Sequence, residues 1–264
     1  VAEWCLDAWH DLPGSTTAAT DPVWRPGIED MVKVYRGGHY NADFFRSAYR
    51  GRIANSAQWP NLGFRIVLAP PPKIQRAAVP LRTFPLVTLA PPAPGQAYAL
   101  PLPDYVRIEM LPLPAGEFLM GSAPGEYLEN SAERPHRVRI SAPFWMGRFE
   151  VTQGQYQAVL GDNPSTFREV GPNAPVETLS WYAAMVFCDR INQQEKAAGR
   201  LPKGMAYRLP TIAEWEYACR ANDTTPGSIR SREEMNRVGW NTYNNENKTH
   251  PVGRKEPNAW GLHD

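Results

Sequence analysis

Prolines are concentrated in one stretch of this chain, and that stretch limits what the whole chain can fold into. Residues 69–104 read APPPKIQRAAVPLRTFPLVTLAPPAPGQAYALPLPD and hold ten of the 27 prolines. Because proline lacks a backbone N–H and fixes its φ angle, this density excludes a helix or a central strand and favours extended backbone. The stretch has only four charged residues, whereas a flexible linker is polar or rich in glycine and serine. We expect an extended arm that packs along the body and joins residues 1–68 to residues 105–264.

The chain before the arm has the pattern of short strands joined by loops. The segment 31–40, MVKVYRGGHY, has strand composition and ends in a glycine pair suited to a tight bend. The segment 61–70, NLGFRIVLAP, predicts a second strand because large apolar residues alternate along it. Residues 11–30 and 41–61 are expected to be irregular loop.

The chain after the arm combines short strands with helices. Residues 105–122 and 136–151 each predict a pair of short strands, and residues 221–264 predict loop with short strand pieces. Three helices are predicted, each begun by a serine or threonine that can accept a hydrogen bond from the first turn. They cover residues 153–160, 181–198 and 212–220, behind Thr152, Ser180 and Thr211. Short mixed sheets with two to three helices and long loops indicate an α+β fold.

Composition excludes some classes of partner. Lys plus Arg is 28 and Asp plus Glu is 27, and no long basic run is present. Nucleic acid is therefore not an expected partner, because phosphate binding needs a dense cationic surface. No apolar run reaches the ~20 residues that span a bilayer, so no membrane span is expected. An extracytoplasmic or cell-surface location is favoured.

The three cysteines are isolated from one another in the sequence. Cys5, Cys188 and Cys219 each stand among bulky apolar or aromatic residues. We expect reduced, buried thiols, and the alternative is one disulfide with an odd thiol.

Several strings in the second part are specific enough to suggest a family. In chain order they are GEFLMGS, ERPHRVRI, FEVTQGQYQAV, APVETLSWYAAMVFCDRIN, YRLPTIAEWEYACRA and HPVGRKEPNAWGLHD. Together they resemble the formylglycine-generating enzyme family, also called sulfatase-modifying factor domains, over roughly residues 105–264. The resemblance implies a variant of the C-type lectin fold, in which long loops are held on small sheets.

Residues 1–68 resemble the C-terminal part of the same family. The string VYRGGHYNADFFRSAYRGR is similar to the family's Arg-Gly-Gly-Ser element, with His39 where serine is usual, and NLGFRIVL is similar to its closing strand. In the family, GLHD is followed after a short stretch by V-x-E-W. This chain stops at GLHD and begins with VAEW. The two parts of one module therefore occur in reversed order, and we expect them to form one structural domain together.

Three explanations of the reversed order stay open. The chain is a circular permutant with the arm as its new connection, a piece of a tandem protein, or a set of pieces given out of their natural order. About four family residues are missing between Asp264 and Val1, and they span at most about 17 Å. If the two ends lie farther apart, head-to-tail self-association becomes the better expectation, because it is an open heterologous contact.

The resemblance also bears on enzyme activity. Family members that make formylglycine share a cysteine pair in the stretch after Arg-Gly-Gly-Ser, where the thiolates bind copper and activate oxygen. Residues 40–50 here read YNADFFRSAYR and contain no cysteine. Copper binding and the oxidase reaction are therefore not expected. The alternative is an oxidoreductase-type formylglycine-generating or related modifying enzyme, or its accessory domain.

We expect instead a binding module for a protein or small ligand, with its recognition surface in the 40–59 loop. Aromatic rings, amides and guanidinium groups together are typical of recognition surfaces. The candidate residues are Tyr40, Asn41, Asp43, Phe44, Phe45, Tyr49, Arg52, Asn55, Gln58 and Trp59. The alternative is that several of these rings pack into the core. The same loop is diversified in the variable proteins of diversity-generating retroelements, which are similar to this family, and a variable protein of this kind is a further alternative.

The family's oxygen-rich sites imply calcium as a structural cofactor. One implied site combines Asp264, the Val1 carbonyl and the Glu3 carboxylate, which would suit a hard cation. The second combines Asn236, the Arg237 carbonyl, Asn244 and the Glu246 carbonyl. Four further residues, Arg208, Glu214, Trp215 and Glu216, are expected to be structural, and Trp4 is expected in a pocket built by residues more than a hundred positions away.

Overall fold

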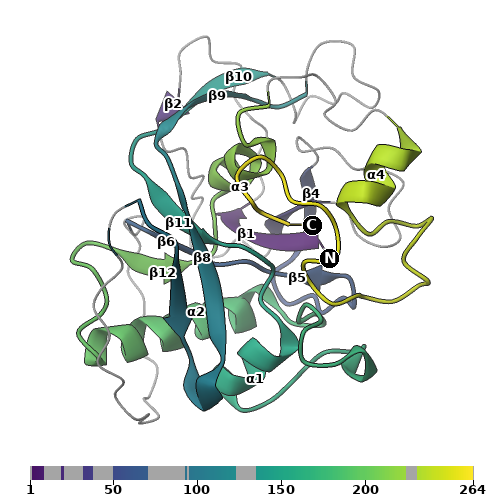
Figure 1. Cartoon of the computed structure of the whole chain (residues 1–264), viewed down its shortest axis with the longest axis horizontal. Coiled ribbons are helices and arrows are strands. Elements are labelled where there is room, and N and C mark those ends of the chain that lie inside the picture. The colour runs from purple at the N-terminus through teal and green to yellow at the C-terminus, as the bar shows by residue number, and fades with distance from the viewer. Residues whose placement is uncertain are drawn as a thin grey trace.

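The computed structural model describes residues 2–8, 19–20, 32–37, 50–70, 93, 95–122, 135–223 and 231–263. Their twelve described strands form three sheets (Figure 1). The strands are β1 Ala2–Ala8, β2 Ala19–Thr20, β3 Val32–Arg36, β4 Arg50–Ala54, β5 Leu62–Gly63, β6 Val67–Ala69, β7 Tyr98–Pro101, β8 Arg107–Leu113, β9 Gly116–Met120, β10 His136–Ile140, β11 Phe144–Gly147 and β12 Ala206–Arg208. The sheet orders are β4-β3-β1-β5, β2-β10-β9 and β12-β6-β11-β8-β7.

Four α-helices accompany these sheets in the described part of the chain. They are α1 Gln153–Leu160, α2 Trp181–Ala197, α3 Ile212–Arg220 and α4 Arg232–Val238, with 3₁₀ turns at Pro103–Tyr105 and Arg168–Val170. The three predicted helices are confirmed, and α2 ends one residue early. No helix within the described ranges is long and apolar enough to cross a membrane.

The fourth helix, α4, was not predicted, because residues 221–264 were expected to be loop with strand pieces. Ser231 accepts a hydrogen bond from the Glu234 N–H, and the Glu234 carboxylate accepts one from the Ser231 N–H. This capping box follows the same pattern that predicted α1 and α3. The described part of this region contains α4 and no strand.

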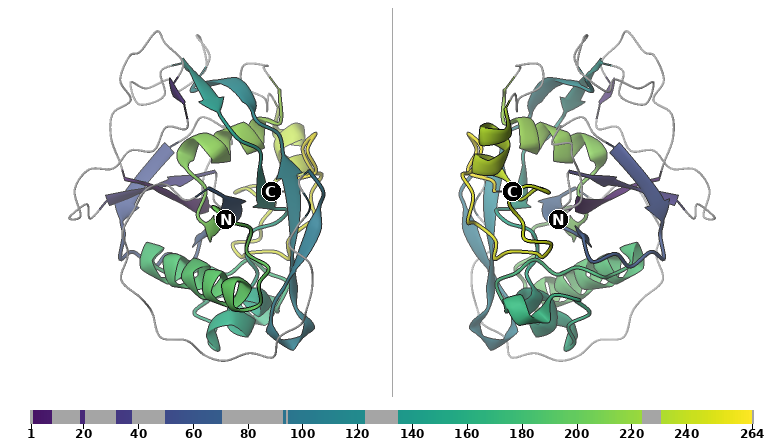
Figure 2. Two further views of the ribbon diagram at one scale, coloured as in Figure 1. Left: turned by 90° about the vertical axis from the view of Figure 1, so that its left-hand side faces the viewer. Right: turned by 90° about the vertical axis from the view of Figure 1, so that its right-hand side faces the viewer.

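Sheet β4-β3-β1-β5 separates two hydrophobic clusters. Trp4 and Leu6 on β1 belong to a cluster with α2, whereas Cys5 belongs to a cluster with α3. This alternation along β1 follows from the two-residue period of a strand. Figure 2 shows β1 lying between α3 on one side and α2 on the other.

The first 68 residues contribute directly to the core of the second part. β6 lies between β11 and β12, and Leu68 pairs with Trp145 on one side and Tyr207 on the other. The Phe64 ring meets Phe187 at 5.2 Å between centroids and Tyr156 at 6.4 Å. Trp4 is fully buried, and its Nε1–H donates to the Leu179 carbonyl, which confirms the prediction of a distant pocket.

The strand pairs predicted in residues 105–122 and 136–151 each have their two strands in different sheets. Segments 107–120 and 136–147 run antiparallel as one ribbon, in which β8 pairs with β11 and β9 pairs with β10. The two strands predicted within each segment therefore do not pair with each other. Pro114 and Pro143 stand at the breaks, where the missing N–H interrupts the ladder and the ribbon passes from one sheet to the next.

Two further expectations about the first part are corrected. The strand predicted over 61–70 is split into β5 and β6, which belong to different sheets. The loop predicted over 41–61 contains β4, which pairs with β3 over five residues. Within the arm, Ala69 lies in β6 and Tyr98–Pro101 forms β7, at an edge of its sheet as the prolines require.

Candidate recognition surface

β4 divides the predicted recognition loop into two separate regions. Arg36 pairs with Arg50 at one end of β3 and β4, and Val32 pairs with Ala54 at the other. The connecting segment 38–49 starts from the first end, whereas Asn55 follows the second. The two ends are about 13 Å apart, since each strand residue advances about 3.3 Å.

Six of the ten predicted residues lie outside the described residues. They are Tyr40, Asn41, Asp43, Phe44, Phe45 and Tyr49. Of the other four, Arg52, Gln58 and Trp59 are exposed and Asn55 is buried. Asn55, Gln58 and Trp59 lie beyond the end of β4, and Arg52 lies in its middle.

Asn55 and Trp59 meet the start of α2, where the structure adds aromatic residues that the sequence did not identify. Trp59 is 45% exposed and Tyr182 is 54% exposed. The Asn55 side-chain amide donates to the Tyr182 hydroxyl at 2.9 Å, and the Asn55 carbonyl accepts from the Trp181 N–H at 3.0 Å. We name Asn55, Gln58, Trp59, Trp181 and Tyr182 the Trp59 patch.

Trp181 fixes the base of the Trp59 patch. Its indole N–H donates to the Cys5 carbonyl at 2.9 Å, and the Lys33 ammonium lies 4.7 Å from its ring centroid. The Tyr182 ring stands edge-on to the Trp181 ring at 5.5 Å between centroids. Tyr182 lies outside the buried residues of α2, which include Ala184, Phe187 and Ile191, and an aromatic residue away from that apolar face was the available signal.

The backbone beside Trp59 is strained. Thr178 has a φ of +59°, a value at which a β-branched residue is an outlier. Its N–H donates to the Trp59 carbonyl at 3.0 Å, and its hydroxyl donates to the buried Glu177 carboxylate at 2.5 Å. These bonds hold Thr178 in place and tie the Trp59 backbone to the segment before α2.

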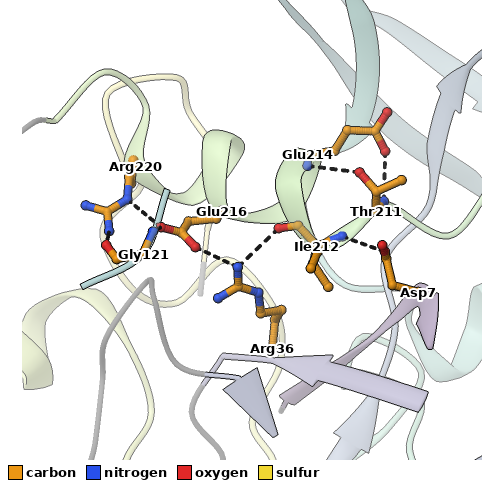
Figure 3. Close-up of polar contacts among 8 residues, drawn as sticks. All are labelled: Asp7, Arg36, Gly121, Thr211, Ile212, Glu214, Glu216 and Arg220. Carbon is orange, nitrogen blue, oxygen red and sulfur yellow. Dashed lines mark hydrogen bonds and ion pairs between the residues drawn. The ribbon is translucent and has the colours of Figure 1, made fainter. Parts of the chain in front are cut away.

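The other end of the β3–β4 pair is anchored by buried charges (Figure 3). Arg36 is fully buried, and one Nη donates to the Glu216 carboxylate at 2.6 Å and to the Ile212 carbonyl at 3.3 Å. The other Glu216 oxygen accepts from the Gly121 N–H at 2.8 Å and from Arg220 Nε at 2.9 Å. The arginine of the Arg-Gly-Gly element therefore holds the root of segment 38–49 against α3.

A second charge pair fixes α3 itself. Arg208 binds Glu214 through two hydrogen bonds of 2.7 Å, and Glu214 also accepts from the Thr211 N–H at 2.8 Å. Burial alone would raise the pKa of Glu214, but the Arg208 guanidinium and the Thr211 N–H lower it below its usual value. Asp7 accepts from the Ile212 N–H at 2.8 Å. The structural role predicted for this set is confirmed.

Of the residues implied in the first calcium site, Glu3 is bound by an arginine. Val1 and Asp264 lie outside the described residues. Both oxygens of Glu3 accept from Arg65, at 3.1 and 3.2 Å, and the same guanidinium donates to the His263 carbonyl at 2.8 Å. Glu3 and the His263 carbonyl thus lie within about 6 Å of each other around one cation.

The residues implied in the second calcium site are also engaged within the protein. The Asn244 side-chain oxygen accepts from the Asn241 N–H at 2.8 Å, and the Arg237 carbonyl accepts from the Glu256 N–H at 3.1 Å. The Asn236 side-chain oxygen accepts from the Asn241 amide at 2.9 Å. Glu246 pairs through its exposed carboxylate with Lys248 at 2.8 Å. Three of the four implied oxygen donors, those of Asn236, Arg237 and Asn244, thus already accept hydrogen bonds from N–H groups of the chain.

Comparison with known proteins places the chain in a family. Residues 101–264 match the Sulfatase-modifying factor enzyme 1-like domain. The chain belongs to the sulfatase-modifying factor family. Its fold is the α+β, C-type lectin fold of the formylglycine-generating enzyme type, as the resemblance implied.

Three known proteins are similar to this chain. Chaperone protein LppX of Paenibacillus barcinonensis is 33% identical over 164 residues, which cover 46% of this chain. The chain spans 58% of the length of that relative. Treponema denticola variable protein 1 has a TM-score of 0.51 and 25% identity, covering 64% of this chain and 72% of that one. PvdO from Pseudomonas aeruginosa has a TM-score of 0.44 and 23% identity, covering 66% of this chain and 71% of that one.

The three cysteines of this sulfatase-modifying factor family member are free thiols. All three lie within the described residues, and none forms a disulfide bond. Cys5 and Cys188 are buried as predicted, whereas Cys219 is exposed because it lies on the outer face of the last turn of α3. Burial raises the pKa of Cys5 well above its usual value, so this residue is a neutral thiol at pH 7.

Proposed function

We propose that this sulfatase-modifying factor family member is a non-catalytic recognition module that binds a protein or small ligand through the Trp59 patch. One observation carries this proposal: Trp59 and Tyr182 are both large and about half exposed, and the segment that holds Trp59 is bonded through Asn55 to Trp181 and Tyr182 at the start of α2. Tryptophan and tyrosine dominate binding energy at interfaces because they bury large areas with few rotatable bonds.

The scaffold beneath the patch supports a binding role. Trp181 and Thr178 fix the backbone on both sides through hydrogen bonds to Cys5 and Trp59. A rigid surface loses little conformational entropy when a ligand binds. Backbone strain of the kind seen at Thr178 clusters at functional sites.

The names of the relatives support the same role. One is called a chaperone and another a variable protein. The second name supports a finer proposal, that residues 40–59 vary between copies of this gene while the scaffold is kept. Sequencing the gene from many isolates tests it, and substitutions spread evenly along the chain would contradict it.

Binding to unbiased libraries tests the Trp59 patch. We would screen the wild-type chain against a random-peptide phage library and a glycan array, and then repeat the assay with Trp59→Ala and Tyr182→Ala. Each substitution is expected to weaken the binding of the recovered ligands at least about tenfold, which corresponds to a loss of about 1.4 kcal/mol of binding free energy. Tyr243→Ala is the matched control, because Tyr243 is 50% exposed and packs under Arg232 instead.

Melting temperatures separate loss of binding from loss of folding. Trp59→Ala and Tyr243→Ala should melt close to the wild-type protein, since the substituted rings are about half exposed. Tyr182→Ala also removes the hydroxyl that accepts from the buried Asn55 amide, so it should melt somewhat lower while staying folded. Ligands that bind Trp59→Ala and Tyr182→Ala as tightly as the wild type would remove the Trp59 patch from consideration.

Membership of the family keeps a modifying enzyme, or its accessory domain, as the second candidate. Copper loading with oxygen consumption on a cysteine-containing peptide tests it. Turnover in that assay would overturn the non-catalytic proposal, whatever the Trp59 patch binds.

A further inference from the structure

We propose that Lys255 supplies the positive charge that the family resemblance assigns to a calcium ion beside α4. The region 231–263 would then be held by an ammonium group of the chain itself, and its stability would not depend on metal.

Lys255 binds where a cation is favoured. Its Nζ donates to the Asn236 carbonyl at 2.6 Å, and the next residue, Glu256, donates its N–H to the Arg237 carbonyl at 3.1 Å. Both carbonyls belong to the last turn of α4, where helix carbonyls lack partners within the helix and carry partial negative charge. Residues 255–256 therefore close the end of α4.

An aromatic ring holds the ammonium in this position. Lys255 Nζ lies 4.0 Å from the Trp240 ring centroid, within the range of a cation–π interaction. The His250 ring stacks on Trp240 at 3.7 Å and 11°, and His250 Nε2 bonds the Asn245 carbonyl at 2.8 Å. Trp240 is thus positioned by the same asparagine-rich loop that the resemblance assigns to the metal.

The implied ligands are turned toward N–H donors. Asn244 accepts from the Asn241 N–H and donates its amide to the Gly239 carbonyl at 3.1 Å. A calcium ion on the Arg237 carbonyl would lie close to the ammonium on the neighbouring Asn236 carbonyl, and the two cations would repel. A structural calcium ion is bound by oxygen atoms. Here the Lys255 ammonium is the cation that contacts the Asn236 carbonyl oxygen.

Thermal unfolding with and without calcium tests the proposal. The wild-type melting temperature is expected to be the same in excess EDTA and in excess CaCl₂, because a ligand stabilises only the state it binds. Lys255→Met should melt about 2–6 °C lower in both, from the loss of the contacts with Asn236 and Trp240. Lys248→Met is the matched control, since Lys248 is a lysine of the same region with an exposed ion pair, and it should melt like the wild type.

Terbium, which replaces calcium and is sensitised by nearby tryptophan, gives a readout that does not need the variant to fold. No sensitised signal from this region is expected in the wild type. A terbium signal that Trp240→Phe removes, calcium stabilisation of the wild type that this substitution abolishes, or a Lys255→Met protein as stable as Lys248→Met would each overturn the proposal.

Discussion

Removal of Arg65 is predicted to destabilise the fold strongly. Arg65 lies between β5 and β6 and donates to Glu3 on β1, to the His263 carbonyl, and to the carbonyls of Gly147 and Arg148 at 3.2 and 3.0 Å. One buried guanidinium therefore uses all its N–H groups to join four separate segments of the chain. The perturbation is Arg65→Met, which keeps the apolar stem and removes every donor.

The expected loss of unfolding free energy is about 3–5 kcal/mol, the cost of removing one partner from a buried ion pair. Glu3 is 2% exposed, and Glu150 is also buried and lies 3.8 Å from Arg65. Arg65→Met leaves these two carboxylates buried beside each other without the guanidinium. A second substitution, Glu3→Gln, should recover part of the loss because it removes one of the two charges.

The pH dependence gives the sign of the effect. Burial raises the pKa of Glu3 above its usual 4.5, Arg65 opposes this rise, and Glu150 adds to it. Because the pKa is raised in the folded state, the contribution of Glu3 to stability is greatest below pH 4.5 and is lost as pH rises through the folded value. Removing Arg65 raises the folded-state pKa of Glu3 further. The stability loss of Arg65→Met relative to the wild type should therefore shrink on acidification from pH 7 toward pH 5.

Urea unfolding of wild type, Arg65→Met, Glu3→Gln and the double variant at pH 5 and pH 7 completes the cycle. A deficit below about 1 kcal/mol at pH 7, the range of an exposed pair, would refute the argument for a buried hub. A deficit that grows on acidification would show that the charge on Glu3 is not its source.

Three further substitutions test other parts of the fold. Glu214→Gln should lower the free energy of unfolding by about 2–4 kcal/mol at pH 7, because it breaks the pair with Arg208. The pKa of Glu214 is lowered in the folded state, so the stability difference between this variant and the wild type should vanish in urea unfolding as pH falls well below 4.5. Gly51→Ala should cost about 1–3 kcal/mol by the same assay, because a Cβ there would lie 2.0 Å from the buried Tyr35 ring, and an unchanged midpoint would contradict the β3–β4 register. Tyr105→Gly should raise stability by about 0.5–1 kcal/mol in thermal melts, because Tyr105 is 99% exposed with a φ of +62°; a lower melting temperature would contradict the strain.

Local signals in the sequence predicted the helices because the contacts that begin a helix are local. The Thr152 and Thr211 hydroxyls accept from the N–H three residues later, and both capping boxes are complete. The same reasoning applied to Ser231 would have found α4. The burial of Trp4 followed from the family resemblance, which placed its pocket in the distant part of the chain.

Partners of strands and of site residues could not be predicted, because they depend on contacts between distant segments. The segment Arg50–Ala54 has two arginines and a glycine and little strand propensity, and it is a strand because Gly51 leaves room for the Tyr35 ring on β3. The contact between Asn55 and Tyr182 joins residues 127 positions apart. The recognition loop was therefore predicted as one region, and the structure divides it at β4.

Buried polar contacts join the first 68 residues to the rest of the chain. Arg36 binds Glu216, Asp7 binds the Ile212 N–H, and Arg65 binds the His263 carbonyl. Apolar burial of β6 between β11 and β12 tolerates small displacements, whereas an unpaired buried charge costs several kcal/mol. These contacts therefore fix the relative position of the two parts, and with it the base of segment 38–49 and the Trp59 patch at opposite ends of one pair of strands.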